Sequence, residues 1–159
     1  ANVDEAGLEE DNEHVRTLSA LASAHGAEVV KICARLEEEL QGLPDADQKE
    51  MLASYGIEES GLVHVIRTGY RTLGLARYFT AGPKEVRAWT FRRGWKAPQA
   101  AGVIHTDFEK GFIRAEVIGF DDYMTHKTEA ACRATGTLRV EGKDYTVRDG
   151  DVMHFLFNV

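Results

Sequence analysis

The sequence lacks the features that mark several classes of protein. Its 159 residues include only two cysteines, Cys33 and Cys132, with no CxxC spacing. Two such cysteines make no disulfide framework and are typical of buried apolar side chains. No apolar run approaches the roughly 18 residues of a membrane-spanning helix, and no basic segment followed by an apolar one indicates a signal peptide. We therefore expect a soluble, cytoplasmic monomer with no membrane partner.

Metal-binding patterns are also missing. The six histidines show no HxxxH spacing and no pairing with cysteine, so the sequence predicts no metal site. His105 and Asp107 lie close together, but no nucleophile accompanies them. We expect both side chains to hydrogen-bond the end of a helix where it meets a sheet.

The net charge of −7 is distributed unevenly. Residues 1–77 hold 7 Lys and Arg against 15 Asp and Glu, whereas residues 78–159 hold 12 against 11. This change predicts a domain boundary near Arg77. The acidic first half argues against a phosphate-binding surface there, while the nearly neutral second half could bind phosphate only through local clustering of basic residues.

The first 77 residues have the pattern of the end of an α/β domain. A helix capped by Asp11 or Asn12 is predicted to be followed by a strand over residues 28–33. That strand is too apolar for one exposed face, which favours a covered, parallel strand. Three further helices are predicted, at residues 35–41, after Asp45 and after Ser60. The expected apolar faces of the first and last helices are Val15, Leu18, Leu21 and Ala22, and Leu62, Ile66, Tyr70 and Leu73.

The second half predicts an α+β fold of the β-grasp (ubiquitin-like) plan. A hairpin over residues 78–91 precedes a short helix that begins at Pro98, and Gly111 separates this helix from a strand over residues 112–118. Short strands follow at 138–140, 144–147 and 152–157, and a helix crossing between two hairpins is the β-grasp layout. The expected core residues are Val86, Ile104, Ile113, Val117, Val152 and Phe155.

Three runs in the second half carry a resemblance to a known family. They are AAGVIHTDFEKGFIRAEV at residues 100–117, YFTAGPKEVRAWT at 78–90 and EGKDYTVRDGDVMHFLFNV at 141–159. Together they resemble the TGS domain that closes the Obg-like ATPase (YchF) family of P-loop NTPases. The resemblance implies a TGS domain at residues 78–159. It also implies that residues 1–77 are the C-terminal α/β tail of a nucleotide-binding domain, with connecting helices.

The resemblance also implies a nucleotide-base site at the start of the chain. Asn2 and Glu5 match the family's Asn-x-x-Glu sequence, in which Glu replaces the Asp that most P-loop GTPases use to read guanine. The longer carboxylate implies relaxed or adenine-leaning selection of the base. Val3 would lie against the base, and Cys33 and Ala34 would form a second element beside it.

No group that could hold the phosphates accompanies this base site. The sequence contains no GxxxxGKS/T motif and no upstream Asp for Mg²⁺, so we expect no catalytic residue, no cofactor and no hydrolysis in this chain alone. The resemblance implies ATP or GTP and Mg²⁺ in a full-length parent, with a role in translation or stress regulation.

Basic and aromatic residues cluster around positions 92–96, and they suggest a surface for RNA. Arginine suits phosphate contact, and tryptophan suits base stacking. TGS domains and Obg-like ATPases are associated with RNA and ribosome contact, which favours the ribosome or structured RNA as partner. A ubiquitin-like protein-binding module and a cover over the parent's ATPase site remain as alternatives. The candidate residues are Arg87, Trp89, Arg92, Arg93, Trp95, Lys96, Lys110 and Arg114.

Overall fold

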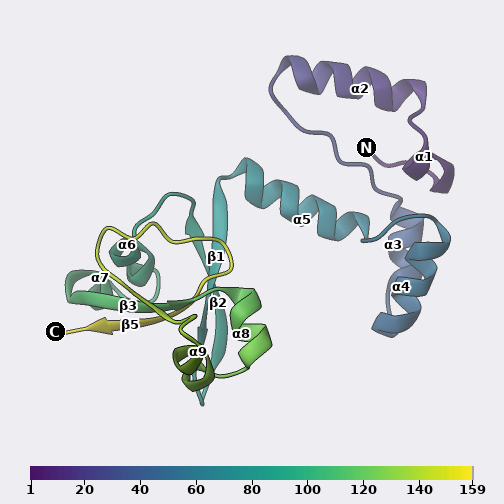
Figure 1. Cartoon of the computed structure of the whole chain (residues 1–159). Helices are drawn as coiled ribbons and strands as arrows, with labels where there is room; N and C mark the ends of the chain where they lie inside the picture. The colour runs from purple at the N-terminus through teal and green to yellow at the C-terminus, as the bar shows by residue number, and fades with distance from the viewer. Residues whose placement is uncertain (159) are drawn as a thin grey trace. The chain divides into compact units, whose positions relative to one another are not determined.

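The change in composition along the chain coincides with a change in architecture. In the computed structural model, which describes residues 1–158, the chain divides into Ala1–Thr72 and Leu73–Val159. The first unit is helical, and the second holds a five-stranded sheet (Figure 1). The division falls five residues before the boundary expected near Arg77, because strand β1 already begins at Leu75.

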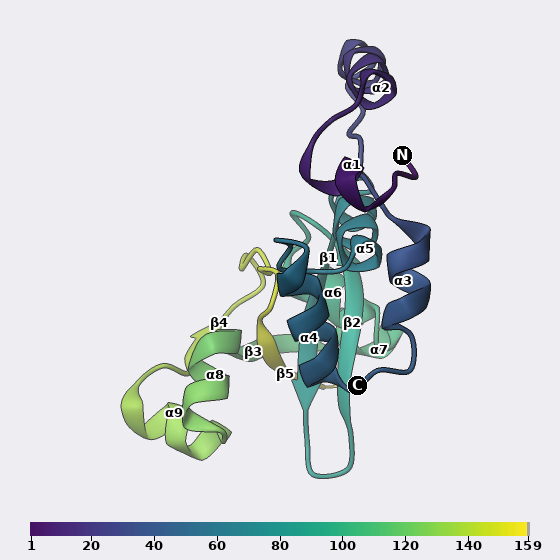
Figure 2. The ribbon, with the colours of Figure 1, turned by 90° about the vertical axis from the view of Figure 1, so that its right-hand side faces the viewer.

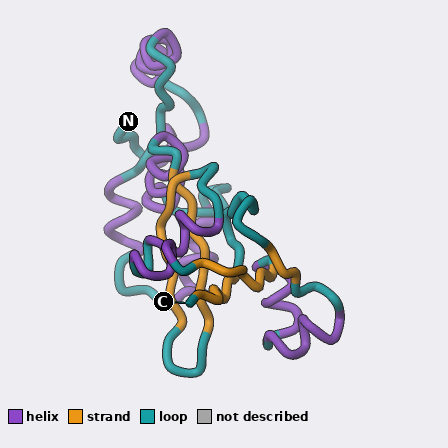
Figure 3. The backbone as a smooth tube through the Cα atoms, turned by 90° about the vertical axis from the view of Figure 1, so that its left-hand side faces the viewer, coloured by secondary structure: helices purple, strands orange, loops and turns teal. Residues whose placement is uncertain are grey.

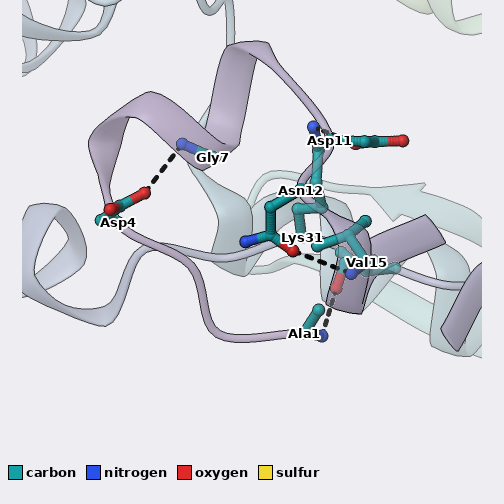
Figure 4. A network of polar contacts seen from close by, with 8 residues as sticks. Ala1, Asp4, Gly7, Asp11, Asn12, Val15 and Lys31 are labelled. Carbon is teal, nitrogen blue, oxygen red and sulfur yellow. Dashed lines mark hydrogen bonds and ion pairs between the residues drawn. The ribbon is translucent and has the colours of Figure 1, made fainter. Parts of the chain in front are cut away.

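Side-chain caps start the first two helices of the first unit. The Oδ1 atom of Asp4 accepts a hydrogen bond from the backbone N–H of Gly7 at 2.9 Å, and that of Asn12 accepts one from Val15 at 2.9 Å (Figure 4). Each cap satisfies a backbone donor that the helix itself leaves unpaired. The helices are α1 (Glu5–Glu9), α2 (Glu13–Ala24), α3 (Ala34–Leu40), α4 (Asp45–Ser54) and α5 (Gly61–Thr72).

The strand predicted at residues 28–33 does not form. Only an isolated parallel bridge joins Asn2 to Ile32. It is held by hydrogen bonds from Val3 N to Ile32 O at 2.8 Å and from Ile32 N to Ala1 O at 2.9 Å. A strand needs a ladder of partners, and no further strand of the described chain lies beside this one. The apolar run therefore stays extended without becoming a sheet.

The small core of the first unit is built by α3 and α4. It consists of Cys33, Leu36, Leu40 and Leu52. The apolar faces predicted for α2 and α5 are mostly exposed, because no other element of this unit covers them: Leu21 is 58% exposed and Leu62 is 55% exposed. None of the helices within residues 1–158 is long and apolar enough to cross a membrane.

The second unit contains a mixed sheet with the strand order β2-β1-β5-β3-β4. Neighbouring strands are antiparallel except β1 and β5, which run parallel with Phe79 opposite Val152. Figure 2 labels the strands, and Figure 3 draws them in orange. The strands are β1 (Leu75–Ala81), β2 (Val86–Arg92), β3 (Phe112–Ile118), β4 (Arg139–Glu141) and β5 (Val152–Phe157). The helices are α6 (Ala97–Gly102), α7 (Thr106–Lys110), α8 (Phe120–His126) and α9 (Glu129–Thr135).

The two faces of the sheet are covered by different helices. On one face α6 packs on the main core, which includes Tyr78, Phe91 and Phe155. On the other face α8 and α9 close a smaller core around Ile118, Cys132 and Val152 (Figures 1 and 2). Successive side chains of a strand point to opposite faces, so the central strands contribute to both cores.

Three expectations for the second half are wrong in detail. Val86 is 74% exposed, because the buried face of β2 is the one that carries Phe91. Ile113 is 55% exposed, because an irregularity in the β3–β5 register between Phe112 and Arg114 breaks the alternation. Residues 144–147 form no strand, and only an isolated bridge joins Thr146 to Lys96.

Candidate functional site

The residues expected at the nucleotide base lie close together in the first unit. The Oδ1 atom of Asn2 accepts a hydrogen bond from the backbone N–H of Ala34 at 3.1 Å. Val3 is tied to Ile32 by a backbone hydrogen bond, and the buried Cys33 precedes α3 as its N-cap. This contact fixes the Asn2 side chain at the start of α3 and leaves its amide group as a donor.

Glu5 occupies the first turn of α1 and faces a basic residue. Its carboxylate lies 3.8 Å from the Nε atom of Arg35, which also pairs with Glu39 at 3.2 Å. The hydrogen bond to Glu39, followed by the charge of Glu5, raises the pKa of Arg35 above its ordinary value. Glu5 therefore contacts the start of α3, as Asn2 does. Its role in base selection stays a prediction.

The basic and aromatic residues of the second unit do not form one continuous patch. Arg87 and Arg92 lie at opposite ends of β2, roughly 17 Å apart at the usual rise per residue, and their odd spacing places them on opposite faces of the sheet. Lys110 ends α7, and Arg114 lies on β3. The candidate basic residues therefore lie on several different surfaces of the second unit.

Both tryptophans are partly engaged by the rest of the unit. The guanidinium carbon of Arg87 lies 4.1 Å from the ring centroid of Trp89, and the Nε1 of that ring donates to Thr80 Oγ1 at 2.9 Å. Trp89 and Trp95 are both half-buried and pack against the main core. Stacking on a base needs a free ring face, and the stacking role expected for these residues stays a prediction.

The basic side chains differ in whether an acid already neutralises them. Arg93 pairs with Asp149 at 3.1 Å, and the Nζ atom of Lys96 lies 3.4 Å from Asp144 Oδ1. Within residues 1–158, three exposed candidates have neither an ion pair nor a side-chain hydrogen bond: Arg92, Lys110 and Arg114. An unpaired cation is fully available to a phosphate, whereas a paired one must first give up its partner.

Sequence reasoning gave no role to the turn between residues 148 and 151. Arg148 and Asp149 lie beside the start of β1, because Asp149 Oδ1 accepts from the backbone N–H of Arg77 at 2.8 Å and Gly150 N donates to Arg77 O at 2.8 Å. Residues 77 and 149 are 72 positions apart, so no local pattern could indicate this contact.

At the end of this turn, the buried Asp151 anchors a polar network. Its carboxylate accepts from Tyr145 Oη at 2.7 Å and from the backbone N–H of Arg148 at 2.8 Å, and Arg139 lies 3.7 Å away. Burial, followed by the hydrogen bond to Asp151, raises the pKa of Tyr145. Asp151 is 3% exposed and fully partnered, so this network is structural.

The structure assembles one group of possible metal ligands that the sequence did not indicate. Ligand atoms of Glu116, Glu129 and His154 lie within 4.8 Å of one another. They come from β3, α9 and β5, which explains why no short spacing revealed them. However, Arg133 pairs with Glu116 at 2.9 Å and already supplies a positive charge there. His105 caps the start of α7 by accepting from Asp107 N at 3.2 Å, whereas we expected the side chains of His105 and Asp107 to bond the end of a helix.

An apolar groove of about 480 Å³ opens beside the β1–β2 turn. Its lining includes Ile104, Phe108, Phe155 and Phe157, with polar groups from the turn at the rim. The rings of Phe108 and Phe157 stack at 3.8 Å between centroids. The groove is suited to an apolar side chain of a partner.

The comparisons with known proteins agree on one family. The YchF-GTPase_C family, described as a protein of unknown function (DUF933), matches residues 75–158. The ribosome-binding ATPase YchF of Pasteurella multocida is 55% identical over 159 residues, which is all of this chain and 44% of that protein. The Obg-like ATPase 1 of Xenopus laevis is 51% identical over 133 residues, which is 84% of this chain and 33% of that protein.

A solved structure gives the same result. The YchF GTPase of Schizosaccharomyces pombe superposes with a TM-score of 0.81 at 38% identity, over 98% of this chain and 42% of that one. The chain thus spans less than half the length of the relatives it matches. With its second unit covered by the family match and its mixed α/β fold shared with a solved member, the chain belongs to the YchF (Obg-like ATPase) family, of which it carries the C-terminal region.

Proposed function

We propose that the second unit is a TGS domain of the β-grasp type and that it contacts ribosomal or other structured RNA. The strand order β2-β1-β5-β3-β4, with parallel strands at its centre, suits a β-grasp. A relative that is 55% identical is named a ribosome-binding ATPase, which supports RNA as the partner.

The observation that carries the proposal is the set of unneutralised basic side chains on a nearly neutral unit. Arg92, Lys110 and Arg114 are exposed and have no acidic partner within the described residues. Unpaired cations on a folded surface attract the phosphate backbone, and their number sets the salt dependence of binding. In this proposal the protein acts in the cytoplasm, where ribosomes work.

The first unit supports a second part of the proposal. Asn2, Val3, Cys33 and Ala34 lie together where Asn2 Oδ1 meets the start of α3, and we infer that they form one side of a nucleotide-base site. The sequence has no GxxxxGKS/T motif for the phosphates of ATP or GTP. We expect the 159-residue chain alone to hydrolyse neither nucleotide, and Mg²⁺ to be held by residues outside it.

Salt titration of RNA binding tests the proposal. The anisotropy of a labelled RNA hairpin is measured with the full 159-residue chain between about 50 and 200 mM salt, the range over which phosphate contacts weaken steeply. Replacing Arg92, Lys110 and Arg114 by Glu should flatten the log–log slope by about two units or more. Replacing the exposed Lys84, Lys127 and Lys143 by Glu is the matched charge-reversal control. Binding that ignores salt would reject phosphate recognition.

A protein partner is the second candidate, and the apolar groove favours it. The stacked rings of Phe108 and Phe157 form part of an apolar lining beside the β1–β2 turn. A partner docked there would bind with little dependence on salt, because apolar burial is not screened. Phe108→Glu should then abolish binding, whereas Arg92→Glu should not.

A further inference from the structure

The strongest unassigned feature of the second unit is the meeting of Arg92 and Arg93, at the end of β2, with the turn that carries Arg148 and Asp149, where Arg93 pairs with Asp149; we call Arg92, Arg93 and Arg148 the arginine cluster. We propose that this cluster contacts RNA through backbone phosphates alone and that Asp149 weakens the contact by neutralising Arg93. The proposal rests on the RNA-binding function proposed above and identifies which side chains carry it and which one limits it.

The cluster is held in place by backbone hydrogen bonds between distant segments. Arg93 N donates to Gly74 O at 2.7 Å, which ties the end of β2 to the start of β1. Arg77 N donates to Asp149 Oδ1 at 2.8 Å, which ties the turn at 148–151 to β1. These bonds hold the two segments that carry the arginines beside β1 before any ligand arrives, so binding does not have to order that backbone.

The charges of the cluster favour an anion. Arg92 and Arg148 are exposed and unpaired within the described residues, and Arg93 pairs with Asp149 at 3.1 Å. Arg148 also borders a groove with Asp121 and Asp122, which reduces its attraction for a phosphate. Within the described residues, Arg92 is therefore the one cation of the cluster for which the structure shows neither an ion pair nor a shared groove with an acidic side chain.

The arginine cluster contains no aromatic side chain of its own. Arg87 covers one face of Trp89, and Trp95 packs against the main core. Because it has no ring of its own, the cluster recognises charge and the spacing of phosphates. It should therefore prefer double-stranded RNA, in which phosphates are dense, to a single strand, and it should not discriminate between base sequences.

Asp149 has two separable roles. Its Oδ1 atom accepts from the backbone of Arg77, and its Oδ2 atom accepts from Arg93. Asp149→Asn keeps an amide oxygen for the first bond but removes the charge that neutralises Arg93. The freed guanidinium can then pair with one more phosphate, which adds about 0.7–0.9 to the log–log salt slope.

The test measures the anisotropy of a 12-base-pair RNA hairpin and of a single strand of equal length, with the full 159-residue chain between about 50 and 200 mM KCl. Asp149→Asn should bind the hairpin roughly threefold to tenfold more tightly at the low end of this range. Arg92→Glu should weaken it by a similar factor. Arg92→Glu tests the cluster even if Asp149→Asn disturbs the fold. Arg92 is exposed and unpaired, so its replacement should leave the fold intact.

Glu116→Gln is the matched control, since it removes one carboxylate charge from another arginine pair of the unit, with Arg133 at 2.9 Å. If Glu116→Gln tightens binding as much as Asp149→Asn, the effect comes from the net charge of the unit, and Asp149 has no special role. If the wild-type chain binds RNA but neither Asp149→Asn nor Arg92→Glu changes its affinity, the cluster is not the site. Tighter binding to the single strand would also overturn phosphate-only recognition. Absence of any salt-dependent binding by the wild-type chain would instead reject the proposed function itself.

Discussion

Replacing Tyr78 should separate the contribution of a buried hydroxyl from that of a buried ring. Tyr78 is fully buried, and its hydroxyl donates to the backbone oxygen of Ala100 in α6 at 2.9 Å. That oxygen also accepts from Val103 N at 3.1 Å, so it keeps a partner when the hydroxyl is removed. Tyr78→Phe should therefore cost only about 1 kcal/mol of unfolding free energy, the net value of one hydrogen bond.

Removal of the ring should cost far more. The ring of Tyr78 meets Phe155 edge-on at 5.6 Å between centroids and lies 5.8 Å from Phe91. Truncation of a buried aromatic side chain costs about 3–5 kcal/mol. With the hydroxyl's contribution, Tyr78→Ala should lose about 4 kcal/mol or more, a large fraction of the stability of a small domain.

Urea unfolding followed by tryptophan fluorescence measures both variants. The chain's two tryptophans, at positions 89 and 95, lie in the second unit, so the signal reports on this unit alone. The free energy of unfolding is obtained for the wild type, Tyr78→Phe and Tyr78→Ala by linear extrapolation. A loss for Tyr78→Phe as large as that for Tyr78→Ala would refute the argument that Ala100 O remains satisfied.

Three further predictions follow from the second unit. A fragment that starts at Leu73 should fold alone and give a dispersed amide spectrum, whereas one that starts at residue 78 should be less stable because it lacks the first half of β1. Burial raises the pKa of Tyr78, so stability present below pH about 10 should fall as pH rises further, and Tyr78→Phe should reduce that fall in alkaline urea titrations. Gly111→Ala should destabilise the unit by about 1–3 kcal/mol, because a Cβ there would lie 1.9 Å from Asn158 O. Gly142→Ala, with no atom within 4 Å, should leave the thermal midpoint nearly unchanged.

The sequence by itself determined the elements whose signals are local. It predicted the strands at residues 112–118 and 152–157 with their observed bounds, because alternating apolar residues and flanking turn residues define a strand without reference to distant parts of the chain. The apolar run at residues 28–33 gave an equally local signal but formed only one bridge, at Ile32. A strand is stable only with a partner, and a local pattern cannot supply one.

Tertiary structure decided which face of each strand is buried and which charges meet. Alternation along β2 defines two faces, but only the packing of α6 makes the face of Phe91 the buried one and leaves Val86 exposed. The arginine cluster depends on contacts over longer distances still, since Asp149 reaches Arg93 from 56 positions away. Charge pairing depends on distance in space, and folding sets that distance independently of separation along the chain.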